Sequence, residues 1–210
     1  MRGIDVSHYQ GVIDWQTLSE QNIRFAFIKA TEGSSTVDER FADNWNNVSR
    51  TELYAGAYHF FSFDSPASSQ AALFIETVGN LEGKLPPVID IEYYGDKRQS
   101  PPDQEAVAES LQELLVILED EYDAKPIIYT TYPVYRRYIK GHFDDYPLWI
   151  RNVYYTPDLS PGLNWQFWQY SDTAVLNGYQ GDEACIDMNA FSGTENQLRQ
   201  YLVQNAAALK

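Results

Sequence analysis

Two acidic residues stand two positions apart in an otherwise apolar and aromatic run, VIDIEYYG at residues 88–95. If this run is a β-strand, the side chains of Asp90 and Glu92 point to the same face. Two carboxylates on one face repel each other, and a buried strand face makes an unpaired charge costly. Such a pair is expected where carboxylates hold a metal ion, lie at an exposed edge, or carry out acid/base chemistry.

The apolar pattern predicts eight strands separated by helices. The strand-like runs are 2–6, 23–30, 53–61, 87–93, 126–131, 147–152, 165–170 and 184–188. Weaker helical patterns occupy 15–21, 38–49, 66–78, 133–140 and 193–206. The clearest helical pattern follows Pro101-Pro102-Asp103, where apolar residues from Val107 to Tyr122 recur on one face. It ends before Lys125-Pro126, because proline disfavours helix in the residue before it.

This alternation indicates the fold class. Strands that alternate with helices predict a parallel α/β sheet, and eight of them predict a closed (β/α) barrel of the TIM-barrel type. The last three strands lack convincing helices between them, so we expect an irregular barrel with fewer helices than strands. No internal repeat or linker is visible, and a single domain spanning residues 1–210 is therefore predicted.

The acidic residues fall at related places in these strands. Asp5 lies near the end of the first strand, Asp90 and Glu92 end the fourth, and Asp187 ends the eighth. In such barrels the chemistry lies at the carboxyl ends of the strands, so we expect all four acids at one mouth. Rings that stack on sugars and carboxylates that cleave glycosidic bonds both suit a polysaccharide substrate. The aromatic residues at late strand positions are Tyr58, Phe60, Tyr129, Trp149 and Trp168.

Each of these residues also has a purely structural interpretation. Asp5 could cap a turn, Asp187 could cap a strand end, and an oxygen-ligand Mg²⁺ or Ca²⁺ site could use the same acids. We expect Lys29 and Glu32 to form an ion pair across a strand end rather than to take part in catalysis. The histidines are scattered, and structural roles are expected for all three: His8, His59 and His142.

Composition excludes several function classes. The net charge of −15, from 30 acidic and 15 basic residues, opposes binding to nucleic acid or to anionic lipid. No apolar run is long enough to span a membrane. One cysteine, Cys185, excludes an internal disulfide framework, and with only three histidines a zinc site is improbable, so we expect no metal and no cofactor. The N-terminal residues MRGIDVSHYQ lack the pattern of a secretory signal.

Eight short motifs appear in an order that resembles glycoside hydrolase family 25, the Chalaropsis-type lysozymes or N-acetylmuramidases. They are GIDVSHYQGVIDW (3–15), FIKATEG (27–33), GAYHFF (56–61), PVIDIE (87–92), IIYT (127–130), PLWI (147–150), WQYS (168–171) and IDMN (186–189). The resemblance covers essentially the whole chain. It implies an irregular (β/α) barrel that hydrolyses the β-1,4 bond between N-acetylmuramic acid and N-acetylglucosamine in peptidoglycan.

The resemblance also assigns roles to individual residues. It implies that Glu92 is the catalytic acid of the D-x-E motif and that Asp90 is its partner carboxylate. The other positions that it carries over are the remaining acids, Asp5 and Asp187, and the tyrosines that would hold the N-acetyl sugar, Tyr58 and Tyr129. The implied partner is bacterial peptidoglycan. We expect a monomer that is secreted or associated with the cell wall; either it leaves the cell by another route, or a leader or neighbouring module lies outside this chain.

The sequence departs from the family pattern after PLWI. The family commonly continues with a small residue and then an aromatic residue at the positions of Arg151 and Val153. Arg151 shares a strand face with Trp149 and could contact the carboxylates of the wall polymer. It could equally pair with a structural acid at the barrel rim, and the sequence leaves both interpretations open.

The mechanism has alternatives at this stage. Glu92 must be protonated when substrate binds, and repulsion from ionised Asp90 and Asp5 would raise its pKa. Asp90 could steer the 2-acetamido group of the substrate as an internal nucleophile, or attack or activate water itself. Positions i and i+2 of a strand lie roughly 6.6 Å apart, which is compatible with both retention and inversion. The competing functions are a non-catalytic glycan-binding barrel and a hydrolase of another N-acetylated polymer such as chitin.

Overall fold

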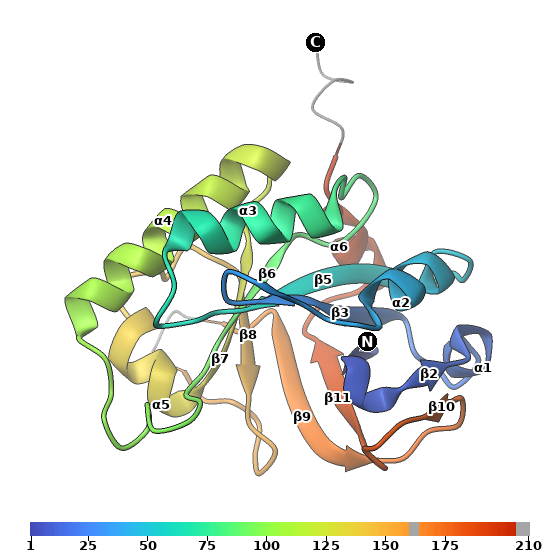
Figure 1. The fold of residues 1–210 in the computed structure, drawn as a ribbon. Coiled ribbons are helices and arrows are strands. Elements are labelled where there is room, and N and C mark those ends of the chain that lie inside the picture. The colour runs from blue at the N-terminus through green and yellow to red at the C-terminus, as the bar shows by residue number, and fades with distance from the viewer. Residues whose placement is uncertain (160–163, 205–210) are drawn as a thin grey trace.

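The computed structural model describes residues 1–159 and 164–204, and a closed sheet lies at its centre (Figure 1). Its strands follow the order β1-β11-β9-β8-β7-β6-β5-β3, and pairing of β1 with β3 closes the ring. The ring consists of β1 (Arg2–Val6), β3 (Phe25–Glu32), β5 (Tyr54–Phe60), β6 (Val88–Ile91), β7 (Ile127–Thr131), β8 (Leu148–Arg151), β9 (Phe167–Ala174) and β11 (Ile186–Phe191). Three two-residue strands lie outside it: β2 (Val12–Ile13), β4 (Thr36–Val37) and β10 (Tyr179–Gln180).

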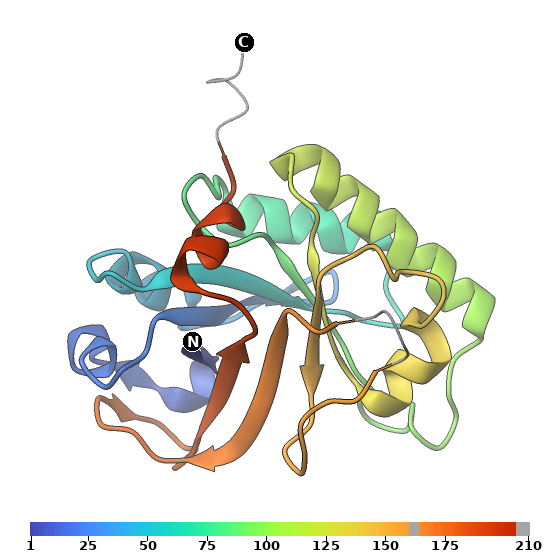
Figure 2. The ribbon, with the colours of Figure 1, turned by 180° about the vertical axis from the view of Figure 1, so that it is seen from behind.

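The helices cover the outside of the ring. They are α1 (Trp15–Ser19), α2 (Phe41–Val48), α3 (Ala67–Val78), α4 (Gln104–Tyr122), α5 (Tyr132–Val134) and α6 (Glu195–Gln200), with a 3₁₀ turn at His8–Gln10 and a π-helical turn at Tyr135–Ile139. Helices α3 and α4 lie side by side against the sheet, and α6 lies near the end of the chain (Figures 1 and 2). None of the helices within the described residues is long and apolar enough to cross a membrane.

Helix α4 shows how the local sequence sets an element. Asp103 caps its first turn by accepting a hydrogen bond from the backbone N–H of Ala106 at 3.0 Å. The predicted apolar face from Val107 to Tyr122 is buried, as expected for an amphipathic helix. The helix ends at Asp123, which adopts a left-handed conformation with φ of 49°, just before Lys125-Pro126.

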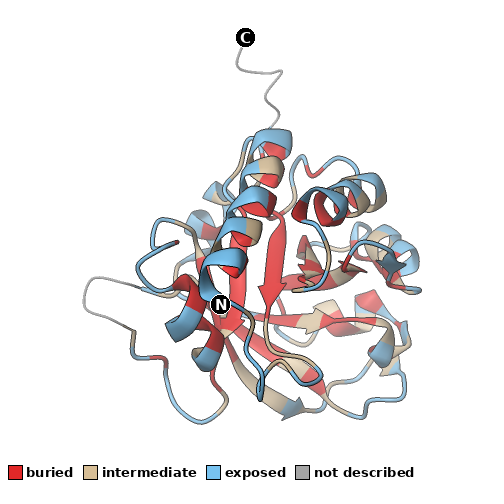
Figure 3. Ribbon diagram, turned by 60° about the vertical axis from the view of Figure 1, so that its left-hand side comes forward, coloured by how far each residue is buried: buried red, intermediate tan, exposed pale blue. Residues whose placement is uncertain are grey.

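The interior of the barrel is filled by every second residue of its strands. Aromatic side chains dominate this cluster, and Phe27 stacks on Trp149 with ring centroids 4.5 Å apart. Two glycines make room for them, since a Cβ atom at Gly3 would lie 2.4 Å from the ring of Phe25 and one at Gly56 would lie 2.7 Å from Phe27. In Figure 3 the strands form the buried centre, and the outer faces of the helices are exposed. A second apolar layer lies between strands and helices.

The eight predicted strands and six helical regions all occur, and most boundaries shift by one to three residues. The larger differences are at helix 133–140, which is divided between α5 and the π-helical turn, and at helix 193–206, which forms a helix only over Glu195–Gln200. The last two residues of the latter prediction lie outside the described residues. The irregularity predicted for the last three strands is confirmed, since no described residue between β8 and β9 is helical.

One strand contradicts the predicted parallel sheet. β11 is antiparallel to both β1 and β9, whereas the other neighbours in the ring are parallel. The connection from β9 to β11 holds no helix, and a chain that reverses without a crossover forms an antiparallel pair. The sequence analysis placed Asp187 at the end of the eighth strand. The structure instead makes it the second residue of β11. Because β11 is reversed, its first residues lie at the carboxyl ends of the other strands.

Candidate active site

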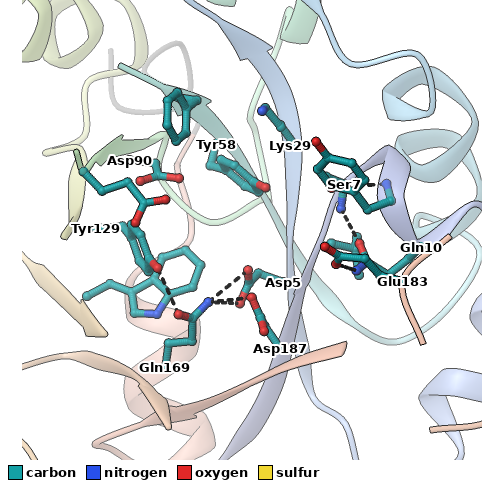
Figure 4. Close-up of a pocket in the computed structure, with 15 residues that line it drawn as sticks. Asp5, Ser7, Gln10, Lys29, Tyr58, Asp90, Tyr129, Gln169, Glu183 and Asp187 are labelled. Carbon is teal, nitrogen blue, oxygen red and sulfur yellow. Dashed lines mark hydrogen bonds between the residues drawn. The ribbon is translucent and has the colours of Figure 1, made fainter. Parts of the chain in front are cut away.

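A cavity of about 270 Å³ opens at the carboxyl ends of the barrel strands; we call it the inner cavity (Figure 4). Its wall brings together eight of the ten side chains that the sequence analysis singled out. They are Asp5, Tyr58, Phe60, Asp90, Glu92, Tyr129, Trp149 and Asp187. The remaining two, Arg151 and Trp168, lie elsewhere and are described below.

The strand register explains why residues so far apart in the chain meet. Across neighbouring parallel strands, Phe60 is the partner of Asp90, Asp90 of Tyr129, and Tyr129 of Trp149. Along each strand, side chains alternate between the inside and the outside of the barrel. Residues paired across neighbouring strands point the same way, so these four side chains form one inward-facing tier. On the opposite side, the antiparallel register makes Asp5 the direct partner of an acid on β11, Asp187.

A glutamine that the sequence analysis missed connects these groups. The side-chain nitrogen of Gln169 donates to Asp5 Oδ2 and to Asp187 Oδ2, both at 3.0 Å. Its side-chain oxygen accepts a hydrogen bond from the hydroxyl of Tyr129 at 2.9 Å. Asn189 adds a second donor, with its Nδ2 atom 2.6 Å from Asp5 Oδ2. Gln169 belongs to the motif WQYS and Asn189 to the motif IDMN. Both occupy inward-facing strand positions, and that placement is the signal that could have identified them.

Asp90 is buried with one oxygen unsatisfied. Its side chain is 8% exposed, and no described residue forms a hydrogen bond to its Oδ1 atom. Burial, and then the negative charge of Glu92, raise the pKa of Asp90 well above its usual range. A buried acceptor without a partner is costly in a finished fold, so this oxygen is an available acceptor for a ligand in the inner cavity.

Glu92 is held in a mixed electrostatic environment. Burial raises the pKa of its carboxyl group, the positive charge of Arg151 lowers it, and the negative charge of Asp5 raises it again, with a net upward shift. Burial likewise raises the pKa of Asp187 to about 8, with a further contribution from Asp5. These carboxyls interact, so their protons leave in steps that belong to the cluster. A cluster of this kind retains protons at a pH where an ordinary carboxyl group is ionised.

Structural roles were expected for several other titratable residues, and two of these expectations are confirmed. Lys29 forms the predicted ion pair with Glu32 at 2.7 Å; it also lines the inner cavity, and its Nζ atom lies 4.9 Å from the centre of the Phe60 ring. His59 is buried between Thr31 at 2.7 Å and Gln70 at 3.0 Å. Burial lowers the pKa of His59 to about 4, which keeps the ring neutral.

A second cavity of about 440 Å³, which we call the outer cavity, adjoins the first. Glu92 lines both cavities and therefore stands between them. Arg151 lines the outer cavity only, and its Nη2 atom donates to Asp172 Oδ2 at 2.6 Å. The pairing with a rim acid that the sequence left open is thus present, and Val153 lines the same cavity.

Trp149 and Trp168 were expected to stack on sugar rings, and neither offers an open ring face to a cavity. Trp168 lines neither cavity, because strand alternation turns its neighbour Gln169 inward, and the Trp168 indole donates instead to the backbone oxygen of Asn152 at 2.7 Å. Trp149 lines the inner cavity but is only 2% exposed, and its Nε1 atom donates to Asn189 Oδ1 at 2.8 Å. It forms part of the cavity floor rather than an open stacking face.

The far end of the inner cavity is polar and was not foreseen from the sequence. Gln10 accepts a hydrogen bond from the backbone N–H of Ser7 at 2.9 Å and donates to Glu183 Oε2 at 3.0 Å (Figure 4). No group of three or more acidic, histidine or cysteine side chains within the described residues is arranged to hold a metal ion.

Comparison with known proteins places this geometry in a family. The family model described as "Glycosyl hydrolases family 25" matches residues 4–179. The structure is similar to that of a family 25 glycosyl hydrolase from Bacillus anthracis, with a TM-score of 0.91 and 46% identity over 96% of this chain and 93% of that chain.

Two curated relatives match nearly all of this chain, and the matched region spans about seven tenths of their own length. Lysozyme M1 of Streptomyces globisporus is 32% identical over 94% of this chain and 70% of its own length. The protein YegX of Escherichia coli K12, described as uncharacterized, is 36% identical over 96% of this chain and 73% of its own length. The matching family model, the shared barrel and the acidic cavity at its mouth lead to one conclusion: this chain belongs to glycosyl hydrolase family 25 and is a glycoside hydrolase.

Proposed function

We propose that this enzyme is a muramidase that cleaves the β-1,4 bond between N-acetylmuramic acid and N-acetylglucosamine in bacterial peptidoglycan. The observation that carries the proposal is the pair formed by Asp90 and Glu92 in the inner cavity: both have raised pKa values, and one Asp90 oxygen has no hydrogen-bond partner among the described residues. A glycan-binding protein would have no need of two buried carboxyls that repel each other.

Glu92 is the general acid in this proposal. Opening a glycosidic bond requires a proton on the leaving oxygen, and the raised pKa of Glu92 keeps that proton available. Glu92 borders both cavities, so a sugar in the inner cavity and the next sugar in the outer cavity would place the bond between them beside its carboxyl group. After the leaving sugar departs, the same carboxylate takes a proton from the attacking water.

Asp90 assists the substrate's own 2-acetamido group. The unsatisfied Oδ1 atom accepts the acetamido N–H, and this contact favours the ionised form of Asp90 when substrate is bound. The acetamido oxygen then attacks the anomeric carbon as the glycosidic bond breaks, and water opens the resulting ring with retention. The alternative, in which Asp90 itself acts as the second carboxylate, predicts that cleavage survives removal of the N-acetyl group.

The surrounding residues hold the sugar. Tyr58, Phe60 and Tyr129 line the inner cavity and supply ring faces and hydroxyl groups. Asp5 and Asp187 are fixed by Gln169 and set the charge of the cluster. Residues 1–210 would form one catalytic domain that acts as a monomer on the cell wall, either secreted or wall-associated.

Analysis of digested peptidoglycan by mass spectrometry tests the proposal. Muramidase action produces fragments with a reducing N-acetylmuramic acid end, whereas cleavage of the other linkage leaves a reducing N-acetylglucosamine end. Chitin oligomers provide the comparison for another N-acetylated polymer. Purified wall that stays uncut, with fragments released only from chitin, would overturn the proposed substrate.

A further inference from the structure

The two cavities that meet at Glu92 have opposite electrostatic character. The inner cavity is lined by five acidic side chains and one lysine, and that lysine is paired with Glu32. Among the described residues, the outer cavity is lined by two guanidinium groups, Arg98 and Arg151, and by one acidic side chain, Glu92. In a chain of net charge −15, this is a local reversal of sign directly beside the proposed acid.

The two arginines come from different segments and remain available to a ligand. Arg98 lies in the loop between β6 and α4, is exposed, and forms no ion pair or side-chain hydrogen bond with any described residue. Arg151 ends β8, and its contact with Asp172 uses the Nη2 atom alone. A guanidinium group has five N–H donors in a planar fork, so donors of both side chains can face a ligand in the cavity.

Aromatic surface surrounds these charges. Tyr154 and Tyr155 are 87% and 61% exposed and line the same cavity. The ring of Tyr155 lies 6.4 Å from that of Tyr132, and the guanidinium of Arg136 lies 5.5 Å from the Tyr132 ring centre. Exposed rings beside guanidinium groups that keep free N–H donors are suited to a ligand that has both apolar or sugar faces and negative charge.

We propose that the outer cavity is a subsite for a carboxylate of the wall polymer, received jointly by Arg98 and Arg151. This inference rests on the proposed function, because it concerns the part of the glycan that extends from the inner cavity past Glu92. In the proposed cleavage the inner cavity holds the muramic acid whose bond breaks, and N-acetylglucosamine follows it in the outer cavity. The carboxylate therefore comes from the next muramic acid along the glycan: from its lactyl group when no peptide is attached, and from its stem peptide when one is. The arginine-lined outer cavity supplies the positive charge that such a carboxylate requires.

Arg98 gives the cleaner test of the two arginines. The charge of Arg151 lowers the pKa of Glu92, so removing Arg151 changes both binding and the proposed acid. Arg98→Ala removes an exposed group that is not held by the fold. The matched control is Arg50→Ala, an exposed arginine that lines a separate cavity with Arg24 and Tyr54.

Three substrates from one wall preparation separate the sources of charge. The first keeps its stem peptides, the second is treated with an amidase that leaves free lactyl carboxylates, and in the third all carboxylates are capped as methylamides. We expect Arg98→Ala to raise KM roughly three- to tenfold on a carboxylate-bearing substrate, to leave kcat and the pH profile unchanged, and to have no effect on the capped polymer. Arg98→Lys should restore part of the loss, and Arg50→Ala should behave as wild type.

The outcomes divide clearly. A loss on the first substrate alone assigns the subsite to the peptide, and a loss on the second alone assigns it to the lactyl group; a loss on both supports their shared chemistry. Equal KM values for Arg98→Ala and wild type on every substrate, or an equal loss on the capped polymer, would overturn the inference. Raised salt should weaken binding of the charged substrates to wild type more than to Arg98→Ala.

Direct binding keeps this inference separate from the proposed function. Calorimetric titration of Glu92→Gln, with and without Arg98→Ala, uses soluble fragments of the same three substrates and requires no cleavage. Carboxylate-dependent binding by a protein whose wild-type form cuts no wall would leave the subsite standing and remove the muramidase function. Cleavage without any effect of Arg98→Ala on binding would do the reverse.

Discussion

Asp5 and Asp187 are direct partners across the antiparallel strands β1 and β11, so that two carboxyl groups face each other at the floor of the inner cavity. Like charges placed opposite each other destabilise a sheet. Gln169 offsets this by donating from one nitrogen to both carboxyls, and the raised pKa of each allows the pair to retain a proton. The fold thus accepts local instability where the sugar would bind.

Glu92→Gln should abolish hydrolysis and leave the fold intact. The amide has nearly the same shape as the carboxyl group but cannot supply a proton, and it removes a negative charge that raises the pKa of Asp90. The melting temperature should hold or rise, and loss of turbidity in a wall suspension should stop. Wall lysis above trace level by this variant would remove Glu92 from the role of acid.

The pH dependence of activity should be bell-shaped with an optimum on the acid side of neutral. The proposed mechanism requires Glu92 protonated and Asp90 ionised, and the raised pKa values of the cluster would set both limbs. Arg151→Ala should move the basic limb to higher pH, because the guanidinium lowers the pKa of Glu92. Initial rates at constant ionic strength measure this, and a rate that still rises above neutral pH would contradict the mechanism.

Stability should fall as the pH rises through the window in which Asp187 differs between the folded and unfolded states. Its pKa is about 8 in the fold and 3.8 ordinarily, so the folded state holds a proton that the unfolded chain has lost between these values. The full stabilisation is present below about pH 4 and is lost by about pH 8. Denaturant titrations of Asp187→Asn should show a shallower decline, by up to about 1.4 kcal/mol per pH unit.

Asp145→Asn is the matched control for that experiment. Asp145 is paired with Lys125 at 2.6 Å, and the hydrogen bond from Lys125 lowers its pKa. Any effect of this exposed group appears at acid pH, below the window of Asp187. Identical slopes for wild type and Asp187→Asn would show that Asp187 is ionised throughout.

Replacing Gln169 with leucine should damage both stability and activity. The change removes the donor shared by Asp5 and Asp187 and the acceptor of the Tyr129 hydroxyl. Leaving several buried polar groups unpaired should lower the free energy of unfolding by about 2–4 kcal/mol. The exposed Gln16→Leu serves as control, and wild-type cleavage by Gln169→Leu would show that the network has no role in the reaction.

Activity should be unaffected by chelators. The proposed acids act as proton donor and charge stabilisers, and their raised pKa values favour retained protons over a bound cation. Rates after treatment with EDTA, with and without added Mg²⁺ or Ca²⁺, test this. Complete loss in EDTA with recovery on adding either ion would favour the oxygen-ligand metal site.

The sequence by itself determined much of this protein. Alternating apolar runs predicted the eight strands, and the amphipathic pattern of 107–122 predicted helix α4, because each signal depends on local periodicity. The spacing of Asp90 and Glu92 predicted that both carboxyls share one face, and both line the inner cavity. The ordered motifs predicted the family, which the comparisons confirm.

Only the tertiary structure decided the rest, because it depends on pairing between distant strands. The reversal of β11 places Asp187 opposite Asp5, and no local pattern in residues 184–188 encodes that direction. The one-residue alternation that turns Gln169 inward and Trp168 outward depends on the register of β9. The outer cavity brings Arg98, from the loop after β6, and Arg151, at the end of β8, to one place beside Glu92, although the two are remote in sequence. Periodicity reports which residues share a face, but closure of the barrel decides which faces meet.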